Sequence, residues 1–423
     1  MKASALLTDF YELTMAASFF ARGMNQPATF DLFVRRLPPQ RRFLVAAGIE
    51  EALALLEDFA FDGDDIAYLR TLGMFDDRFL AYLVDMRFSG DTWAVWEGEV
   101  VFGGEPLLSV TAPLIEAQLM ETLLLNCVSY QTAVASKAAR VTLACGGRAA
   151  LTPSPASGGD GRGETPASIA GRSWVDFSLR RDHGGDAGLG VARAAFLAGA
   201  GATSNVLAGQ RYGIPLTGTM AHSYILAFGD EAAAFRAYAE DFPGRTTLLI
   251  DTNDTVAGAR IAARVAQELA MEGRAVQGVR LDSGDLAVLS REVRAILDDA
   301  GLPGLQIFVS GDLDEYRIRD LLAGGAPIDG FGVGTRLGTV ADAPSLSSVY
   351  KLVEGPNGPV AKHSEGKATL PGRKQVYRQV RDGAMDGDVL ALRDEPAPEG
   401  ARPLLRQVIR GGERIIGAED IAT

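Results

Sequence analysis

Four acidic residues follow two of the short apolar runs in the middle of the sequence, and carboxylates in such places can carry chemistry. They occur as Asp251-x-x-Asp254 and as Asp282-Ser283-Gly284-Asp285. Such pairs hold Mg²⁺ directly or through water, or accept hydrogen bonds from ribose hydroxyl groups. The alternative is structural, because an aspartate after a strand routinely caps the next helix. Several acids together at strand ends favour a sugar or metal site.

A glycine-rich run follows another apolar segment and has the features of a phosphate-binding turn. In Phe331-Gly332-Val333-Gly334-Thr335, glycines would let backbone N–H groups approach a phosphate, with the threonine hydroxyl as a further donor. A tight turn without a ligand is the structural alternative. The place of this run at the end of a series of similar units favours the phosphate.

Arginines stand beside two of the expected strand ends. Arg180 and Arg181 follow Asp176-Phe177, and Arg280 precedes Asp282. Guanidinium groups in these positions suit a carboxylate or a phosphate through paired hydrogen bonds. Surface ion pairs are the alternative, and they are common in a chain with an excess of acids.

The sequence contains three histidines, His183, His222 and His363. A single histidine is more often structural than catalytic. His222 lies in Gly218-Thr219-Met220-Ala221-His222-Ser223, immediately after an expected strand, which makes it the best candidate for a general base or a phosphoryl acceptor. His183 is expected in a solvated loop, and His363 lies among charged residues of the tail.

The elements that must position these residues are short apolar runs, each ending in a polar or glycine residue. The runs are 173–175, 215–216, 247–250, 278–281, 307–309 and 331–333, with helical patterns at 257–271, 286–299 and 315–322. This alternation predicts βα units with parallel strands, in a closed barrel or an open doubly wound sheet. In both folds, ligands bind at the carboxyl ends of the strands.

The flanking segments have a different character. A helix is expected after Asp9, which would cap it, with Glu12 three residues further on. Expected strands at 350–353, 375–379, 389–392 and 405–409 could complete a sheet that begins with a strand at 30–34. Between 152 and 172, 11 of 21 residues are Gly, Pro or Ser, which predicts a solvated loop or hinge.

Composition excludes several classes of function. The 423 residues carry a net charge of −13, which disfavours nucleic acid and anionic membrane surfaces as partners. No apolar run is long enough to span a bilayer, and the first residues do not form an export signal. Two cysteines without metal-ligand spacing fit a reducing, cytoplasmic location.

In their order along the chain, the motifs resemble those of the nicotinate phosphoribosyltransferase family, a group of type II phosphoribosyltransferases, over nearly the whole length. They are LTDFYELTM at 7–15, FSLRR at 177–181, TSNVLAG at 203–209, GTMAHS at 218–223, VRLDSGD at 279–285, FGVGT at 331–335, PSL at 344–346 with VYKLV at 349–353, and TLPG at 369–372. One such motif would be weak evidence, whereas the ordered series is specific.

The resemblance implies an α/β fold in which 131–345 form an irregular βα barrel (TIM-like). A second, α+β domain would be built from the N- and C-terminal segments, 1–130 with 346–423, in a homodimer with shared active sites. The implied reaction condenses nicotinate with phosphoribosyl pyrophosphate (PRPP) to nicotinate mononucleotide and pyrophosphate, for NAD biosynthesis. ATP hydrolysis would be coupled through a phosphohistidine, with Mg²⁺ as the metal and no organic prosthetic group.

The resemblance also implies roles for individual residues. His222 would be phosphorylated by ATP, and Tyr11, from the partner subunit, would sandwich the pyridine ring with Phe177. The other nicotinate-binding residues would be Arg180, Ser204, Thr219 and Arg280. PRPP and its phosphates would be bound by Asp254, Asp282, Gly311, Asp312, Gly332, Gly334 and Thr335. The Mg²⁺ ligands would be Asp282 and Asp285.

Three alternatives stay open beside this reading. The related nicotinamide-using enzyme has an aspartate at the position of Ser204, which would repel a carboxylate, so Ser204 favours nicotinate. A quinolinate-using relative should need a denser cluster of cationic residues. A phosphosugar-binding homologue without turnover should lack His222 or the Asp282–Asp285 pair. The 152–172 loop is longer than expected for the family, and His183 and His363 match none of its histidines.

Overall fold

The computed structural model describes residues 4–146, 172–362 and 369–417. The chain forms two compact units, which adjoin in the sequence between Ser136 and Lys137 and between Pro344 and Ser345. We call the unit that contains both flanking segments the terminal unit, and the other the central unit. Helix α6 (Glu121–Ala144) contains the first of these boundaries. Most of the expected 152–172 loop, and His363, lie outside the described residues.

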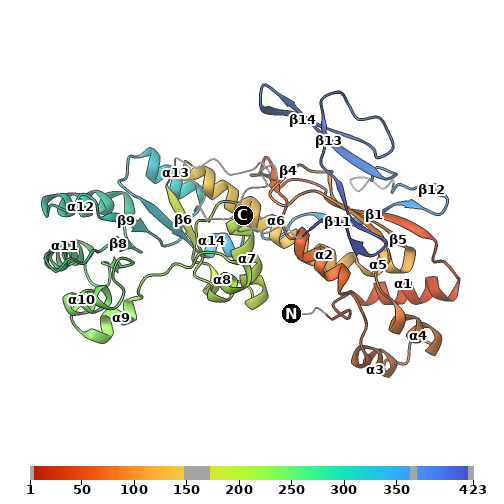
Figure 1. The fold of residues 1–423 in the computed structure, drawn as a ribbon, viewed down its shortest axis with the longest axis horizontal. Helices are drawn as coiled ribbons and strands as arrows, with labels where there is room; N and C mark the ends of the chain where they lie inside the picture. Colours follow the sequence, from red (N-terminus) through yellow and green to blue (C-terminus); the bar gives the residue numbers. More distant parts are fainter. Residues whose placement is uncertain (1–3, 147–171, 363–368, 418–423) are drawn as a thin grey trace. The chain divides into compact units, whose positions relative to one another are not determined.

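The terminal unit is built around an antiparallel, seven-stranded sheet with the order β12-β11-β1-β5-β3-β16-β17, of which Figure 1 labels β1, β5, β11 and β12. The strands of this sheet are β1 (Pro27–Val34), β3 (Asp91–Ala94), β5 (Pro106–Pro113), β11 (Ser348–Gly355), β12 (Gly358–Pro359), β16 (Arg406–Arg410) and β17 (Glu413–Arg414). The strands β11 and β16 from the tail pair with β1 and β3, respectively. The prediction that the tail completes an N-terminal sheet is therefore confirmed for the expected strands 350–353 and 405–409, whereas those at 375–379 and 389–392 belong to a separate sheet, because they pair with each other.

Smaller elements complete this unit. Its helices are α1 (Phe10–Ala21), α2 (Ile49–Glu57), α3 (Gly63–Thr71), α4 (Asp77–Asp85) and α5 (Leu114–Leu119). A two-stranded sheet joins β2 (Leu44–Val45) and β4 (Val100–Val101), and a three-stranded sheet has the order β14 (Ala384–Leu392), β13 (Lys374–Arg381), β15 (Arg402–Pro403).

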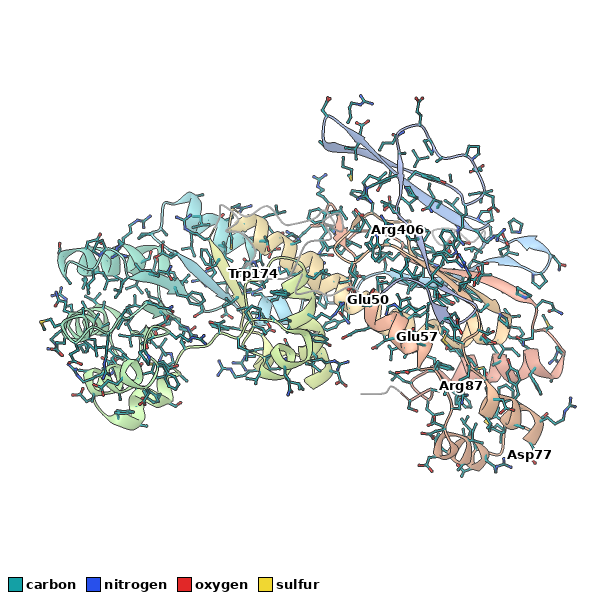
Figure 2. All side chains as sticks on the ribbon, viewed as in Figure 1. Glu50, Glu57, Asp77, Arg87, Trp174 and Arg406 are labelled. Carbon is teal, nitrogen blue, oxygen red and sulfur yellow. The ribbon has the colours of Figure 1, made fainter. Side chains whose placement is uncertain are left out.

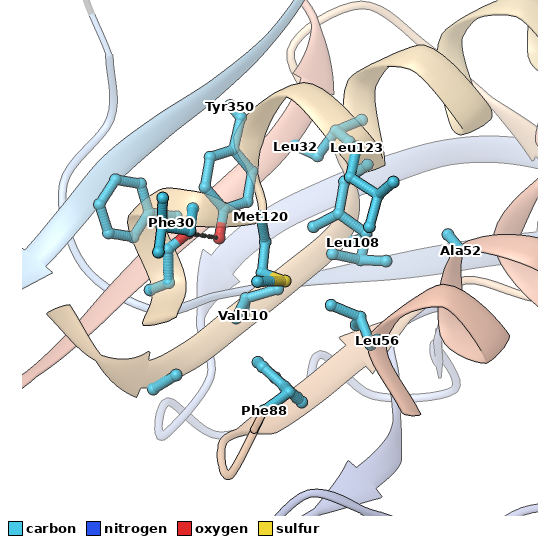
Figure 3. Packing of buried hydrophobic residues seen from close by; sticks show 14 of the residues in the cluster. Phe30, Leu32, Ala52, Leu56, Phe88, Leu108, Val110, Met120, Leu123 and Tyr350 are labelled. Atoms are coloured by element: carbon cyan, nitrogen blue, oxygen red, sulfur yellow. Dashed lines mark hydrogen bonds between the residues drawn. The ribbon is translucent and has the colours of Figure 1, made fainter. Parts of the chain in front are cut away.

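The core of the terminal unit joins the two flanking segments of the chain. Phe30 of β1 and Tyr350 of β11 stack with ring centroids 4.9 Å apart, and Leu108 and Val110 of β5 are completely buried in the same cluster (Figure 3). The Tyr350 hydroxyl donates to the carbonyl of Ala117, 2.9 Å away. Burying this apolar surface stabilises the sheet by about 25 cal/mol per Å².

Helix α1 begins directly after Asp9, as predicted, but the expected capping by the Asp9 side chain is absent. Oδ2 of Asp9 instead lies 2.8 Å from Oγ1 of Thr122, which is also 2.8 Å from Glu12 Oε1. A tertiary contact with Thr122 thus replaces the local one.

Glu12 makes the stability of the terminal unit depend on pH. Its side chain is completely buried, and burial raises the pKa of its carboxyl group from 4.5 to about 7. Between these two pH values the folded chain keeps a proton that the unfolded chain releases. The stabilisation is therefore fully present below pH 4.5 and is lost as the pH rises through 7.

We expect Glu12→Gln to remove on the order of 2 kcal/mol of the fall in unfolding free energy between pH 4.5 and 7, because glutamine does not titrate. Urea unfolding at a series of pH values measures the effect. Glu413 is exposed, so Glu413→Gln makes the same change of charge and should leave the pH dependence as in the wild type. Equal pH dependence in Glu12→Gln and wild type would contradict the assignment.

The central unit contains a five-stranded parallel sheet with the order β6-β10-β9-β8-β7. The strands are β6 (Ser173–Asp176), β7 (Thr247–Leu249), β8 (Gly278–Leu281), β9 (Gln306–Val309) and β10 (Gly330–Val333). The helices are α7 (Gly185–Leu197), α8 (Val206–Tyr212), α9 (His222–Phe228), α10 (Glu231–Asp241), α11 (Thr255–Met271), α12 (Leu286–Asp299), α13 (Glu315–Ala323) and α14 (Thr335–Gly338), with a 3₁₀ turn, η1, at Leu179–Arg181. The prediction of βα units with parallel strands is confirmed.

A closed barrel is not confirmed. Beyond β6 the sheet continues only through two isolated parallel bridges, from Asp176 to Thr203 and from Thr203 to Leu216. The strand expected at 215–216 is therefore a single bridge. Within the described residues, no backbone ladder joins the Leu216 segment to β7, so the sheet is open.

The second half of α6 anchors the parallel sheet by polar contacts. Trp174, buried in the middle of β6 (Figure 2), donates from Nε1 to Oγ1 of Thr142 at 2.9 Å. The buried ammonium of Lys137 lies 2.6 Å from Glu315, the first residue of α13, and 3.1 Å from Asp342. Buried charges of this kind must stay paired, so α6 fixes the segments after β9 and β10. None of the helices in the three described stretches combines the length and apolar character needed to cross a bilayer.

Candidate functional site

The carboxyl ends of the parallel strands bring residues from six segments to one edge of the sheet. Phe177 follows β6, Thr219 follows the Leu216 bridge, and Asp251 follows β7. Asp282 follows β8, Ser310 follows β9, and Gly334 follows β10. This edge is where ligands bind in parallel α/β folds.

Arg280 is the centre of this arrangement. Its Nε donates to Ser310 Oγ, its Nη1 to Thr219 Oγ1 and its Nη2 to Asp282 Oδ1, each at 2.8 Å. The guanidinium carbon lies 5.4 Å from the centre of the Phe177 ring. Four separate segments therefore fix one guanidinium group. Of its five N–H bonds three are used, and one remains on each terminal nitrogen for an anionic ligand.

The Phe177 ring occupies space that two other strands leave open. A Cβ on Gly332 of β10 would lie 2.6 Å from a carbon of this ring, so only glycine allows the ring to pack there. Phe308 of β9 lies on the same side, with its ring centroid 5.9 Å from that of Phe177. The glycine of the predicted phosphate turn thus also makes room for the aromatic ring.

Asp282 is held in its charged form. Its Oδ1 accepts from Ser310 Oγ at 2.5 Å as well as from Arg280. Burial alone would raise the pKa of this carboxyl group, but the Ser310 hydrogen bond and the Arg280 charge outweigh it and hold the pKa below its ordinary value. A charged carboxylate suits hydrogen bonds from sugar hydroxyls.

The other strand-end acids differ in what they contact. Asp254 caps α11 by accepting from the Ala257 N–H at 2.7 Å, and Asp285 caps α12 in the same way. For these two, the capping alternative describes the contacts that the structure contains. Asp251 instead accepts from the Asp282 N–H and the Ser283 hydroxyl through Oδ2, while its Oδ1 is buried without a hydrogen-bond partner.

His222 is the first residue of α9 and lies beside the segment that follows β7. Its Nδ1 is 3.1 Å from Oγ1 of Thr252, which follows β7. This side-chain contact therefore connects the segment after Leu216 with the segment after β7, although no backbone hydrogen-bond ladder joins the two within the described residues. The contact engages one ring nitrogen and leaves Nε2 for other chemistry.

The turn after β9 is under conformational constraint. Gly311 has φ +93° and Asp312 has φ +48°, so two consecutive residues are left-handed. A Cβ on Gly311 would lie 2.1 Å from the Asp282 carbonyl oxygen. Left-handed backbone at a non-glycine residue such as Asp312 costs free energy, and such residues are enriched at functional sites.

The remaining predicted site residues lie outside the Arg280 contacts. Arg180 is exposed on η1 and forms no hydrogen bond or ion pair with the described residues. Ser204 donates its N–H to the Asp176 carbonyl at 2.9 Å, and Thr335 is the exposed first residue of α14.

Tyr11 belongs to the terminal unit, where its half-exposed ring lines a hollow beside Glu121 and Lys351. His183 is exposed.

Two side chains in these contacts were missed as site residues from the sequence, Ser310 and Thr252. Ser310 is the first residue after β9 and Thr252 the third after β7, so both lie in the same strand-end segments as the predicted acids. Serine and threonine are common in loops, so their position after a strand is the only signal. No group of three or more His, Cys, Asp or Glu side chains that could hold a metal occurs in the part of the chain that the structure describes.

Comparisons with known proteins agree with one another. Residues 6–129 match the family model of the nicotinate phosphoribosyltransferase (NAPRTase) N-terminal domain. The chain is 47% identical over 411 residues to nicotinate phosphoribosyltransferase pncB2 of Mycobacterium tuberculosis, covering 97% of this chain and 83% of that protein. It is 42% identical over 408 residues to nicotinate phosphoribosyltransferase of Bacillus subtilis, covering 94% and 78%, respectively.

The fold gives the same result. The crystal structure of human nicotinic acid phosphoribosyltransferase is similar with a TM-score of 0.81 and 29% identity, covering 98% of this chain and 91% of that one. Identities of 42–47% extend over nearly the whole chain and over more than three quarters of each of the two bacterial proteins. The chain therefore belongs to the nicotinate phosphoribosyltransferase family of enzymes.

Proposed function

We propose that this chain condenses nicotinate with PRPP to give nicotinate mononucleotide and pyrophosphate, a step of NAD biosynthesis from nicotinate. The observation that carries the proposal is the Arg280 arrangement, in which a guanidinium group with unused N–H bonds lies between an aromatic ring and a charged carboxylate. Those three features suit a pyridine carboxylate and a phosphoribosyl group in one place.

The reaction needs no base to activate its nucleophile. The lone pair of the pyridine nitrogen forms the bond to the anomeric carbon, while the carbon–oxygen bond breaks and its electron pair leaves with pyrophosphate. Positive charge develops on the ribose, which the Asp282 carboxylate stabilises from a preorganised position. Arg280 offsets negative charge on the bound anions.

The aromatic and glycine residues position the substrates. Phe177 would stack on one face of the pyridine ring and Tyr11, contributed by a partner subunit of a homodimer, on the other. Burial and the neighbouring carboxylate of Glu121 raise the pKa of the Tyr11 hydroxyl to about 12. The 5′-phosphate would bind at Gly332, Gly334 and Thr335. Gly311, Asp312 and Asp254 would contact the ribose and the phosphates. Arg180 and Thr219 would contact nicotinate.

Carboxylate oxygens at this edge of the sheet fit a hard divalent cation. Asp282 and Asp285 each use Oδ1 within the protein, and Asp251 has a buried oxygen without a partner. Mg²⁺ would be held by Asp282 and Asp285 together with the substrate phosphates. When bound, it would offset the charge on the leaving pyrophosphate.

ATP hydrolysis would be coupled through His222, whose imidazole would accept the phosphoryl group. Because the transfer reaction needs no general base, His222 would not have to act as one. Replacing His222 with alanine is expected to abolish the ATP-dependent gain in nicotinate mononucleotide while ATP-independent transfer continues. Product and ADP are measured together. His183→Ala, which removes an exposed histidine of the same unit, should keep wild-type coupling. An unchanged ratio of ADP to product in His222→Ala would refute this role.

A product assay with PRPP, Mg²⁺ and one pyridine substrate at a time tests the main proposal. Nicotinate mononucleotide formed from nicotinate is expected, with ADP when ATP is present. Product from nicotinamide or quinolinate would assign the chain to those sister reactions, and the first would contradict the inference from Ser204. Thermal stabilisation by PRPP without turnover would identify a phosphosugar-binding homologue.

The larger architecture belongs to the same proposal. We infer that the terminal and central units are the two domains expected from the sequence, and that the central unit is an irregular barrel whose open side is joined by the His222–Thr252 contact. We place the reaction in the cytoplasm because neither Cys127 nor Cys145, the two cysteines of the chain, forms a disulfide bond.

A further inference from the structure

We propose that Ser310 is a positioning residue, whose hydroxyl group fixes Arg280 and Asp282 in one arrangement and so keeps their remaining polar atoms available to a single ligand. This inference rests on the proposed function, because it assigns that ligand as PRPP. Ser310 itself need not touch the substrate.

Ser310 closes a ring of three hydrogen bonds. It is buried, with 3% of its surface exposed, directly after β9. Its Oγ accepts from Arg280 Nε at 2.8 Å and donates to Asp282 Oδ1 at 2.5 Å, while Arg280 Nη2 donates to the same Oδ1 at 2.8 Å. A hydroxyl can donate and accept at once, which neither alanine nor a hydrophobic residue can do.

The ring determines the orientation of the guanidinium plane. Ser310 holds Nε, Asp282 holds Nη2, and Thr219 holds Nη1 from a third segment. Without Ser310, the two terminal contacts remain but the Nε edge is free, so the plane can turn on the Phe177 ring. Asp282 would also lose one of the two hydrogen-bond donors at Oδ1, so the orientation of its carboxylate, and with it the position of Oδ2, would no longer be fixed.

A purely structural role for the hydroxyl has weaker support. The nearest backbone acceptor of Ser310 is the Leu281 carbonyl at 3.5 Å, one ångström further than Asp282 Oδ1. Ser290 on α12 offers a matched comparison. It is completely buried in the same unit, and its hydroxyl contacts only a backbone carbonyl, that of Ala287 at 3.4 Å.

We expect Ser310→Ala to lower kcat/KM for PRPP by about 30- to 100-fold, the usual effect of losing a hydrogen bond to a charged group. Most of the change should be in the KM for PRPP, with a smaller fall in kcat. Ser310→Cys keeps the size of the side chain without a strong hydrogen bond and should resemble alanine. Ser290→Ala should stay within about threefold of the wild type.

Two further measurements separate this inference from the proposed function. In an Arg280→Gln background, Ser310→Ala should cost less than in the wild type, because the part of its effect that acts through Arg280 is already lost and only the contact with Asp282 remains. A crystal structure of Ser310→Ala should show the guanidinium turned from its wild-type plane. Wild-type kcat/KM in Ser310→Ala, full rescue by Ser310→Cys, or unmoved Arg280 and Asp282 side chains would each overturn the inference. The crystal structure decides it even if the wild type forms no nicotinate mononucleotide, a result that would refute only the proposed function.

Discussion

Replacing Arg280 with glutamine is expected to lower kcat/KM for nicotinate mononucleotide formation by about three orders of magnitude. Glutamine removes the positive charge and cannot reach Ser310, Thr219 and Asp282 together. Asp282 would then remain as a partly buried carboxylate without its counter-charge, and the substrate anions would lose their cation. Initial rates at varied PRPP and nicotinate concentrations measure the effect.

Two comparisons make the Arg280 result specific. Arg280→Lys keeps the charge but replaces a planar fork by a single ammonium, so it should recover only a small part of the activity. Arg274 lies exposed just before β8, and Arg274→Gln makes the same change of charge away from the carboxyl ends of the strands. If Arg280→Gln and Arg274→Gln behaved alike, the site would be misplaced.

Replacing Gly311 with alanine is expected to lower kcat/KM by about 100-fold and to destabilise the folded chain by about 1–3 kcal/mol. The added Cβ would lie 2.1 Å from the Asp282 carbonyl oxygen, on a backbone with φ +93°. Relief of that clash must move either the Ser310-Gly311-Asp312 turn or the Asp282 loop. Both moves would break the contacts of Arg280.

Gly301 provides the matched control for Gly311. It has φ +73° and open space around its Cβ position, so Gly301→Ala carries the left-handed strain without the clash. It should lose some stability, measured by thermal unfolding, and keep wild-type kcat/KM. Equal kinetic losses in the two variants would mean that strain, and not the contact with Asp282, is responsible.

Local patterns made much of the central unit predictable. The expected strand 278–281 and helix 286–299 have the bounds of β8 and α12, because the apolar pattern lies within each segment and Asp285 caps the helix directly before its first residue. The strand expected at 215–216 does not form in the structure. Two apolar residues bound by turn residues are too few to define a ladder, and only one bridge forms.

The roles of the strand-end acids were not predictable in the same way. Asp254, Asp282 and Asp285 occupy similar places in sequence, yet two cap helices and the third binds Arg280. A helix cap involves only the aspartate and the residues that directly follow it, so it can be predicted from the local sequence. The Arg280 contact requires Ser310 and Thr219, which are 30 and 61 residues from Arg280.

The sequence by itself determined which residues follow each parallel strand, and the ordered motifs determined the family. Those features are local, or depend only on order along the chain. The tertiary structure decided which strand ends are neighbours, since β10 lies between β6 and β9 and brings Gly332 against Phe177. It also decided that Ser310 bridges Arg280 and Asp282. Strand order and such contacts depend on pairing between distant segments, which no local pattern encodes.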